Sequence, residues 1–176
     1  YNGKESVQIY DYSLATKWAL SDTVVEPSHS ELLESFFGQS KAFSYDGSVL
    51  AVGALNQKLG DHRFDLVQVY QKDNGKYLQK GQTLEAAGGI FRFGEHLALS
   101  QRGDRLAVSS TLNGDYKVQV YKYWDGHWEL MWNSFSEFDD PIDSISMSPD
   151  GDRVAVERNC DPPHAPCVSV FEERSL

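Results

Sequence analysis

Runs of alternating hydrophobic and polar residues recur along the chain, and the same runs return in the same order. The stretches AFSYDGSVLAV, ALSQRGDRLAV and SMSPDGDRVAV close around Gly47, Gly103 and Gly151, so a glycine turn returns about every 50 residues. A second marker follows each stretch, VQVY twice and then VSVF, and a further copy, VQIY, stands near the start without a preceding turn. These markers end at Tyr10, Tyr70, Tyr121 and Phe171. The chain is therefore built from an internal repeat.

Each repeat predicts a strand, a tight turn and a second strand. A serine three residues before each turn glycine can cap the turn amides, and only glycine adopts the left-handed conformation that ends such a turn without a steric penalty. The flanking LAV, VAV and VQVY runs are β-branched, aromatic and alternating, as strands are. Weaker patterns predict a fourth strand at 77–79 and 127–132, with 17–20 as its counterpart near the start. Only 27–35, PSHSELLES, has the capping-box pattern of a short helix.

Four short strands in each repeat are typical of β-propeller blades, whereas a stacked solenoid usually has shorter repeats. The run VLAVGAL is apolar on both faces, as expected for a sheet that is covered on both sides. We therefore expect an all-β fold of four-stranded antiparallel blades within one β-propeller domain. Residues 1–35 would hold the end of a preceding blade and a connector, 36–88 and 89–138 two complete blades, and 139–176 a partial blade.

The order of residues in the first full repeat is specific enough to compare with a known repeat. Phe37-Gly38 is followed by Ser40, Asp46-Gly47 and Val52-Gly53-Ala54, and this order resembles the FG-GAP repeat of integrin-α-type β-propellers. The resemblance implies a propeller in which Phe37 and Phe93 are buried at equivalent places. It also implies a ring of six to eight blades, so we expect either part of a larger propeller or an arrangement between subunits.

Later repeats depart from this pattern. The copy that begins at Phe93-Gly94 has Ser109-Ser110 where the FG-GAP motif has Gly-Ala, and the third copy has Ile142-Asp143 in place of Phe-Gly. The SPDG turn of the third copy is also similar to that of WD40 propellers, which are the second resemblance. The residues that we expect to superpose in the second strands are Val52, Val108 and Val156.

Calcium is the first candidate ligand, because propellers of the integrin type often bind it between the first two strands. Such a site needs several carboxylates on one loop. The corresponding loops SYDGS, SQRGD and SPDGD offer at most two each. We therefore expect no metal and no cofactor.

A three-residue motif in the second turn suggests a possible function. Arg102-Gly103-Asp104 spells the tripeptide that many integrins recognise, but the turn already requires Gly103, and Asp104 has a counterpart in Asp152. Adhesion through this tripeptide is therefore the alternative to a plain turn.

The cysteines Cys160 and Cys167 lie in the loop CDPPHAPC. A disulfide that closes this small loop fits a secreted protein. The alternatives are free thiols and a zinc site that includes His164 and Asp161. We expect the disulfide, and with it a secreted or cell-surface location.

Composition narrows the classes of partner. Of the 176 residues, 40% are hydrophobic and 24% are charged, as in a globular protein, and no apolar run is long enough to span a membrane. The 16 basic and 26 acidic residues give a net charge of −10, so we do not expect nucleic acid as a partner. The chain starts at Tyr1 without a leader, and we expect either a removed signal or a longer polypeptide.

The stretches between the second and third strands of each repeat, at 55–65, 111–116 and 158–167, differ most from one another. Rigid strands commonly position such loops for binding. The candidate partner-binding residues are Asp61, His62, Arg63 and His164.

The sequence contains no phosphate-binding loop and no nucleophile to which a base can be assigned. We therefore expect a non-catalytic propeller that binds other proteins, further copies of itself or the rest of a longer chain. One alternative is an intracellular WD40-like scaffold, which reduced cysteines would favour. The other is a glycan-binding or glycan-active propeller, in which carboxylates and aromatic residues such as Trp128 would meet on the axial face.

Overall fold

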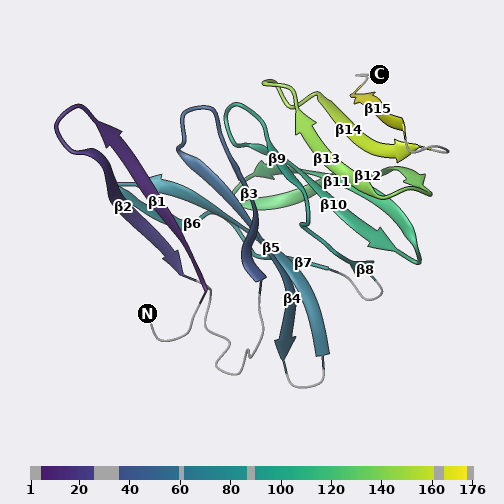
Figure 1. The fold of residues 1–176 in the computed structure, drawn as a ribbon, viewed down its shortest axis with the longest axis horizontal. Helices are drawn as coiled ribbons and strands as arrows, with labels where there is room; N and C mark the ends of the chain where they lie inside the picture. Colours follow the sequence, from purple (N-terminus) through teal and green to yellow (C-terminus); the bar gives the residue numbers. More distant parts are fainter. Residues whose placement is uncertain (1–4, 26–35, 60–61, 87–89, 161–164, 174–176) are drawn as a thin grey trace.

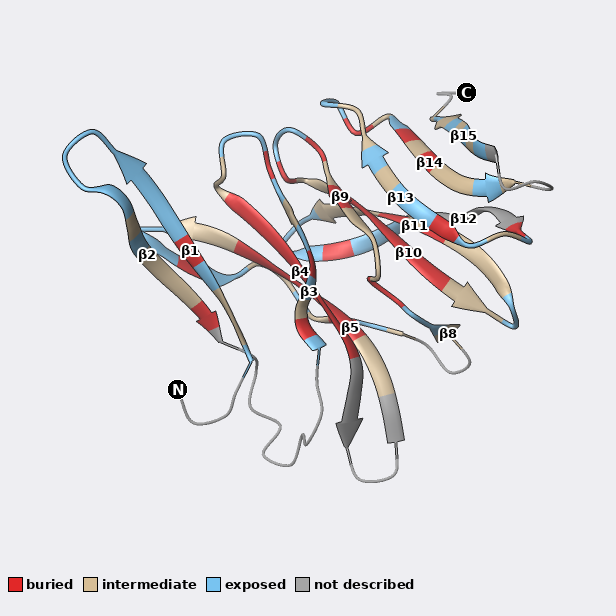
Figure 2. Ribbon diagram, viewed as in Figure 1, coloured by how far each residue is buried: buried red, intermediate tan, exposed pale blue. Residues whose placement is uncertain are grey.

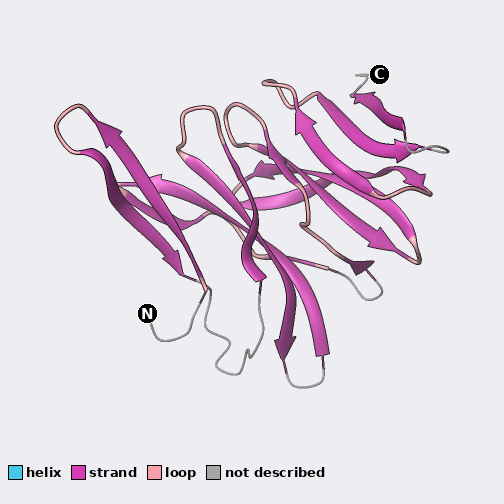
Figure 3. Ribbon diagram, in the orientation of Figure 1, coloured by secondary structure: helices cyan, strands magenta, loops and turns pink. Residues whose placement is uncertain are grey.

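The computed structural model describes residues 5–25, 36–59, 62–86, 90–160 and 165–173. Over these ranges the chain forms strands and turns and no helix, as Figure 3 shows. The short helix predicted at 27–35 lies outside the described residues. In the part of the chain that the structure describes, no helix is long and apolar enough to cross a membrane.

The strands form four antiparallel sheets in chain order. The first sheet contains β1 (Ser6–Ser13) and β2 (Lys17–Val25). The second contains β3 (Phe36–Phe43), β4 (Val49–Leu59), β5 (His62–Asp73), β6 (Lys76–Gln79) and β7 (Leu84–Glu85). The third contains β8 (Ile90–Phe91), β9 (Leu97–Leu99), β10 (Arg105–Leu112), β11 (Asp115–Trp124) and β12 (His127–Phe138). The fourth contains β13 (Ile142–Met147), β14 (Arg153–Cys160) and β15 (Ala165–Glu172).

The four sheets stand side by side, with the first and the fourth at opposite ends of the row (Figure 1). The opening strand of each later sheet lies next to that of its neighbour, because β3 contacts β9 and β9 contacts β13. In the second sheet the strands run in the order β3-β4-β5-β6, and β7 continues the outer strand by pairing with β5. The predicted all-β fold of antiparallel propeller blades is confirmed.

The three turns have the same geometry, as their sequences predict. The N–H of Gly47 donates to the carbonyl of Ser44 at 3.0 Å, and the same bond joins Gly103 to Ser100 at 3.0 Å. The third turn repeats it between Gly151 and Ser148 at 2.9 Å. All three glycines have positive φ angles, of 70°, 64° and 78°. Each serine hydroxyl also accepts a hydrogen bond from the backbone N–H two residues beyond the glycine.

A ladder of backbone hydrogen bonds links these turns from sheet to sheet. The residue after each turn serine takes part: the N–H of Tyr45 donates to the carbonyl of Gln101 at 3.2 Å, and the N–H of Gln101 donates to the carbonyl of Pro149 at 2.9 Å. Proline has no N–H, so Pro149 cannot donate in turn. In both hydrogen bonds the donor therefore lies in the earlier sheet and the acceptor in the next sheet along the chain.

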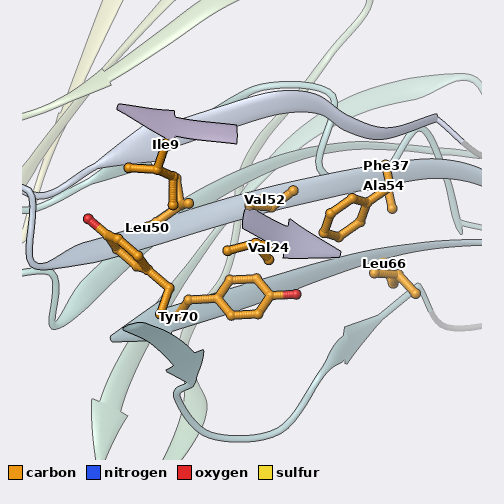
Figure 4. Packing of buried hydrophobic residues seen from close by; sticks show 9 residues of the cluster. Ile9, Val24, Phe37, Leu50, Val52, Ala54, Leu66 and Tyr70 are labelled. Carbon is orange, nitrogen blue, oxygen red and sulfur yellow. The ribbon is translucent and has the colours of Figure 1, made fainter. Parts of the chain in front are cut away.

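One hydrophobic core fills each space between neighbouring sheets. Figure 4 shows the first of them, in which Ile9 and Val24 of the first sheet face Leu50, Val52 and other residues of the second. Figure 2 shows the result, since the middle strands β4, β5 and β10 are largely buried while β1 is largely exposed. Successive residues of β4 enter different cores, as Val49 and Ala51 face the third sheet. Both faces of β4 are therefore covered, which explains its continuous apolar run.

The residues expected at equivalent places lie there. Phe37 and Phe93 are both buried, and each precedes a glycine of positive φ, 86° at Gly38 and 89° at Gly94. The valines of the second strands are fully buried and pair with the first and third strands of their own sheets; they are Val52, Val108 and Val156.

Most of the residues predicted to form loops after the second strands belong to strands instead. At 55–65 the strands β4 and β5 continue as a hairpin, with Gln57 opposite Phe64 and Leu59 opposite His62. Likewise β10 and β11 continue through most of 111–116, and β14 extends to Cys160. The backbone hydrogen bonds between neighbouring strands continue beyond the buried parts of the strands. The strands therefore extend into sequence that is less apolar.

Candidate functional site

A groove of about 460 Å³ lies between β1 and the second sheet. Five consecutive residues of β1, from Val7 to Asp11, line one side, so the backbone edge of the strand forms that wall. The opposite wall consists of Lys41, Phe43, Asp46, Gly47, Ser48, Lys72 and Tyr77. Because β1 pairs only with β2 among the described strands, its other edge faces this groove.

The groove occupies the place that a second strand fills in the later repeats. A methyl group added at Gly103 would meet the side chain of Val49 at 2.5 Å, and one added at Gly151 would meet that of Arg105 at 2.5 Å. Val49 and Arg105 are each the first residue of the second strand in the preceding sheet, β4 and β10 respectively. A methyl group at Gly47 would meet nothing within 4 Å. Within the described ranges, the first sheet therefore has no second strand beside the turn at Gly47.

Polar contacts hold the walls of the groove in place. The Lys72 ammonium donates to the Asp11 carboxylate at 2.9 Å, and this hydrogen bond raises the pKa of Lys72. The Tyr77 hydroxyl donates to the carbonyl of Gly47 at 2.5 Å. Lysine and aspartate charges therefore flank an apolar floor that includes Phe43, whose ring lies edge-on to that of Tyr77 at 6.3 Å.

The turn below the groove carries a strongly acidic carboxyl group. The Asp46 carboxylate accepts hydrogen bonds from the Ser48 N–H at 2.9 Å and from the Ser44 hydroxyl at 2.8 Å. These bonds, the Ser48 amide first, lower the pKa of Asp46 to about 2. The carboxylate is therefore ionised at neutral pH, and its hydrogen bonds stabilise the turn.

The residues predicted to contact a partner are not brought together in the described part of the chain. Asp61 and His164 lie outside it. The backbones of His62 and Arg63 begin β5, opposite Leu59 and Lys58, and their side chains are not described. The predicted contacts at these four positions stay predictions.

The tripeptide Arg102-Gly103-Asp104 forms part of the second turn. Arg102 is exposed, but Gly103 is buried against Val49, and the Asp104 carboxylate accepts a hydrogen bond from the Ser100 hydroxyl at 2.7 Å. The turn thus uses two of the three residues for its own structure.

Cys160 and Cys167 form a disulfide with a Cα–Cα distance of 5.8 Å. It joins the ends of β14 and β15, where Arg158 lies opposite Cys167. Of the three alternatives left open by the sequence, the structure contains the disulfide. Among the described residues, no group of three or more histidine, cysteine or acidic side chains is arranged so that it could hold a metal ion.

The tryptophans of β11 and β12 lie in different environments. Trp128 is buried between the second and third sheets, and its indole N–H donates to the carbonyl of Lys80 at 2.9 Å. Trp124, four residues earlier, is exposed. The side chain of Trp132 lies outside the described residues. Packing between blades is therefore the role of Trp128.

Sequence reasoning missed the groove and the exposed aromatic residues of the first sheet, Tyr12 and Trp18. A signal for both was present. The marker VQIY has no turn unit before it. The stretch YDYSLATKW, which begins with the last residue of this marker, resembles the stretch YKYWDGHW that follows Val120. A close comparison of these stretches would have shown that the first sheet repeats an aromatic surface without the strands that accompany it elsewhere.

Solved structures with the same fold come from proteins of different kinds. One is a complex of KlAtg21 with the coiled-coil of AgAtg16, with a TM-score of 0.61 and 18% identity over 94% of this chain and 46% of that one. A putative 6-phosphogluconolactonase from Bacteroides uniformis has a TM-score of 0.54 and 16% identity over 96% of this chain and 48% of its own. A prolyl endopeptidase has a TM-score of 0.52 and 17% identity over 96% of this chain and 25% of its own.

The chain thus spans less than half the length of each of these structures. No protein-family model matches the sequence. No curated protein matches it either. At such low identity the likeness extends to the fold alone. The stacked antiparallel sheets, the repeated turns and these structural neighbours together show that the chain has the fold of β-propeller blades.

Proposed function

We propose that this propeller is a non-catalytic module that binds other proteins, and that the groove beside β1 takes an extended segment of the partner. The observation that carries the proposal is the open space at Gly47, where the equivalent glycines of the next two turns each contact a residue of the preceding second strand. A strand added to the free edge of β1 would restore that contact.

The chemistry of the groove defines the segment that fits. The backbone edge of β1 supplies hydrogen bonds to any extended chain, and side-chain pockets select the sequence. The residue over Gly47 would take the place held by Val49 over Gly103 and by Arg105 over Gly151, so a valine or the aliphatic part of an arginine fits there. The next apolar positions would contact Ile9, Phe43 and Tyr77. The chain's own second strands, such as RLAVSSTL at 105–112, have this pattern.

A synthetic peptide of sequence RLAVSSTL provides the test. Calorimetry should show that it binds the 176-residue chain, and hydrogen exchange should show new protection of the β1 amides. The control peptide RLPVSSTL lacks one backbone N–H and cannot complete the ladder, so its binding should be at least about tenfold weaker. Equal binding of both peptides, or no binding of either, would show that β1 does not accept a strand.

Variants of the chain test the location of binding. Phe43→Ser removes the apolar floor of the groove and should weaken binding of RLAVSSTL about tenfold. Tyr45→Ser is the matched control, because Tyr45 is an exposed aromatic residue two positions away that does not line the groove. If the two variants lose affinity equally, the peptide binds elsewhere.

We also propose that the propeller is of the FG-GAP type. Burial of Phe37 and Phe93 beside glycines of positive φ supports this assignment. The close approach of Gly53 to Gly94 supports it too, since a methyl group at Gly53 would collide with the Gly94 carbonyl. The motif thus has a physical role where one blade meets the next.

The disulfide supports a secreted or cell-surface setting, because such bonds persist in oxidising compartments. Mass spectrometry of freshly isolated protein, alkylated before reduction, tests this setting. The expected result is that Cys160 and Cys167 are not alkylated. Two alkylated thiols would favour the intracellular scaffold instead.

A further inference from the structure

The first sheet presents an aromatic face on the side away from the second sheet, and no other part of the described chain covers it. Tyr12 lies opposite Trp18, and Tyr10 lies opposite Leu20, in the pairing of β1 with β2. Residues that alternate with them, such as Ile9, enter the core shared with the second sheet. Trp18 is 69% exposed, and Tyr10, Tyr12 and Leu20 are each about half exposed. We call these four residues the aromatic face.

The third sheet carries the same face, and there its tryptophan is buried while Leu130 is 42% exposed. Tyr123 lies opposite Trp128, and Tyr121 lies opposite Leu130, which reproduces the two pairs of the first sheet. The rings of Tyr123 and Trp128 are 5.3 Å apart at 57°, and those of Tyr12 and Trp18 are 5.3 Å apart at 58°. Yet Trp128 is only 3% exposed.

The surface that covers Trp128 belongs to the second sheet, and it includes the segment 80–82, which forms hydrogen bonds with Trp128. Val67 and Val69 of β5 and Ala51 of β4 share one core with Trp128, and Tyr121 and Tyr123 pack against it. Ala51 lies opposite Val69 in the pairing of β4 with β5. An aromatic face on one sheet thus fits a valine-alanine face on the preceding sheet.

The fourth sheet carries that valine-alanine face, and none of the residues that the structure describes covers it. The marker VSVF of β15 places Val168 and Val170 where VQVY places Val67 and Val69, and Ala155 lies opposite Val170. Val168 and Val170 are 63% and 62% exposed, whereas Val67 and Val69 are buried. We call Ala155, Val168 and Val170 the valine face.

We propose that a second copy of this chain binds head to tail, with the aromatic face of one copy packed on the valine face of the other. The contact would repeat the part of the interface between the second and third sheets that β4 and β5 form, and the described fourth sheet has no counterpart of the segment 80–82. The faces lie on different sheets, so the interface is heterologous and produces closed rings or longer assemblies. This surface shares only Tyr10 with the groove proposed to bind an extended segment, and Trp18 and Val170 do not line that groove.

Sedimentation of the 176-residue chain at concentrations up to about 100 μM provides the first test. The expected result is an average mass that rises with concentration above the 19.8 kDa of one chain. Trp18→Ala and Val170→Asp should each weaken association roughly 30-fold, the effect of losing a central interface residue. Both residues are exposed, so thermal unfolding of the variants should match that of the unchanged chain.

Mixing the two variants is the decisive experiment. Trp18→Ala keeps an intact valine face, and Val170→Asp keeps an intact aromatic face, so an equimolar mixture should form a heterodimer although each variant alone is monomeric. Trp124→Ala is the matched control, since Trp124 is also exposed but belongs to neither face, and this variant should associate like the unchanged chain.

Several results would overturn the proposal. A chain that stays monomeric throughout the concentration range does not bind itself. Self-association that persists in Val170→Asp requires another surface, and a mixture that forms no heterodimer excludes head-to-tail contact. Binding of the peptide RLAVSSTL is measured on different residues, so a chain that fails here can still bind the peptide, and the reverse holds.

Discussion

The Asp65 carboxylate of the second sheet accepts a hydrogen bond from the backbone N–H of Phe93, at the start of the third sheet, at 3.1 Å. The same bond joins the first sheet to the second, because Glu5 accepts from the N–H of Phe37 at 2.5 Å. Asp65 and Glu5 both stand two residues before a VQVY or VQIY marker. At the junction with the fourth sheet, Tyr116 holds the corresponding position and Phe-Gly is absent. The carboxylate and the Phe-Gly pair therefore occur together.

Replacing Asp65 tests the contribution of this bond. Asp65→Ala should lower the free energy of unfolding by about 1–3 kcal/mol, because the Phe93 N–H loses a charged acceptor at a partly buried site. Urea unfolding followed by tryptophan fluorescence measures the change. Asp73→Ala, at an exposed end of β5, should stay within about 0.5 kcal/mol of the unchanged chain. Equal effects of the two variants would contradict a role for the bond.

Two turn glycines separate backbone strain from packing. Gly47→Ala and Gly103→Ala both place a methyl group at a positive φ, which costs about 1–2 kcal/mol in either turn. Only at Gly103 does the methyl also collide with Val49. Gly103→Ala should therefore lose about 1–3 kcal/mol more than Gly47→Ala in chemical unfolding. Matching losses would mean that the second and third sheets adjust to the methyl without strain.

Removal of the disulfide should destabilise the fourth sheet. The bond closes a short loop across a sequence separation of 7 residues, so replacing both Cys160 and Cys167 by serine should cost about 2 kcal/mol. Thermal unfolding with and without reductant gives the same comparison on the unchanged chain. The double variant should not respond to the reductant, and a response would show that the reductant acts elsewhere.

Acid should weaken the turns through their aspartates. Hydrogen bonds lower the pKa of Asp46 from 3.8 to about 2, and a hydrogen bond from the Ser148 hydroxyl is the first cause of the lowered pKa of Asp150. A carboxyl group whose pKa is lower in the folded state adds stability above its ordinary pKa and loses it as the pH falls toward the folded value. The variant with asparagine at both positions should therefore lose less stability than the unchanged chain between about pH 4 and pH 2.

Unfolding in urea at a series of pH values measures this difference. Asp73→Asn provides the control, since Asp73 is an exposed aspartate at the end of β5 outside the turns. If the unchanged chain and the variant with two asparagines lose stability in parallel over this range, the turn aspartates do not contribute.

The sequence by itself determined the turns, the strands and the repeat. A turn such as SYDG holds its serine cap, its aspartate and its left-handed glycine within four residues, so local chemistry specifies it. The apolar positions of VLAVGAL likewise predicted a strand that is covered on both faces. Phe37 and Phe93 could be placed because one motif repeats around both.

Only the tertiary structure decided which of these equivalent surfaces are covered. Val69 and Val170 occupy the same position in their repeats, as do Trp128 and Trp18, yet one member of each pair is buried and the other exposed. Burial depends on whether another sheet stands alongside, and that is a long-range property which no local pattern contains. The length of the β4–β5 hairpin and the groove at Gly47 have the same origin, since pairing and packing between distant segments set both.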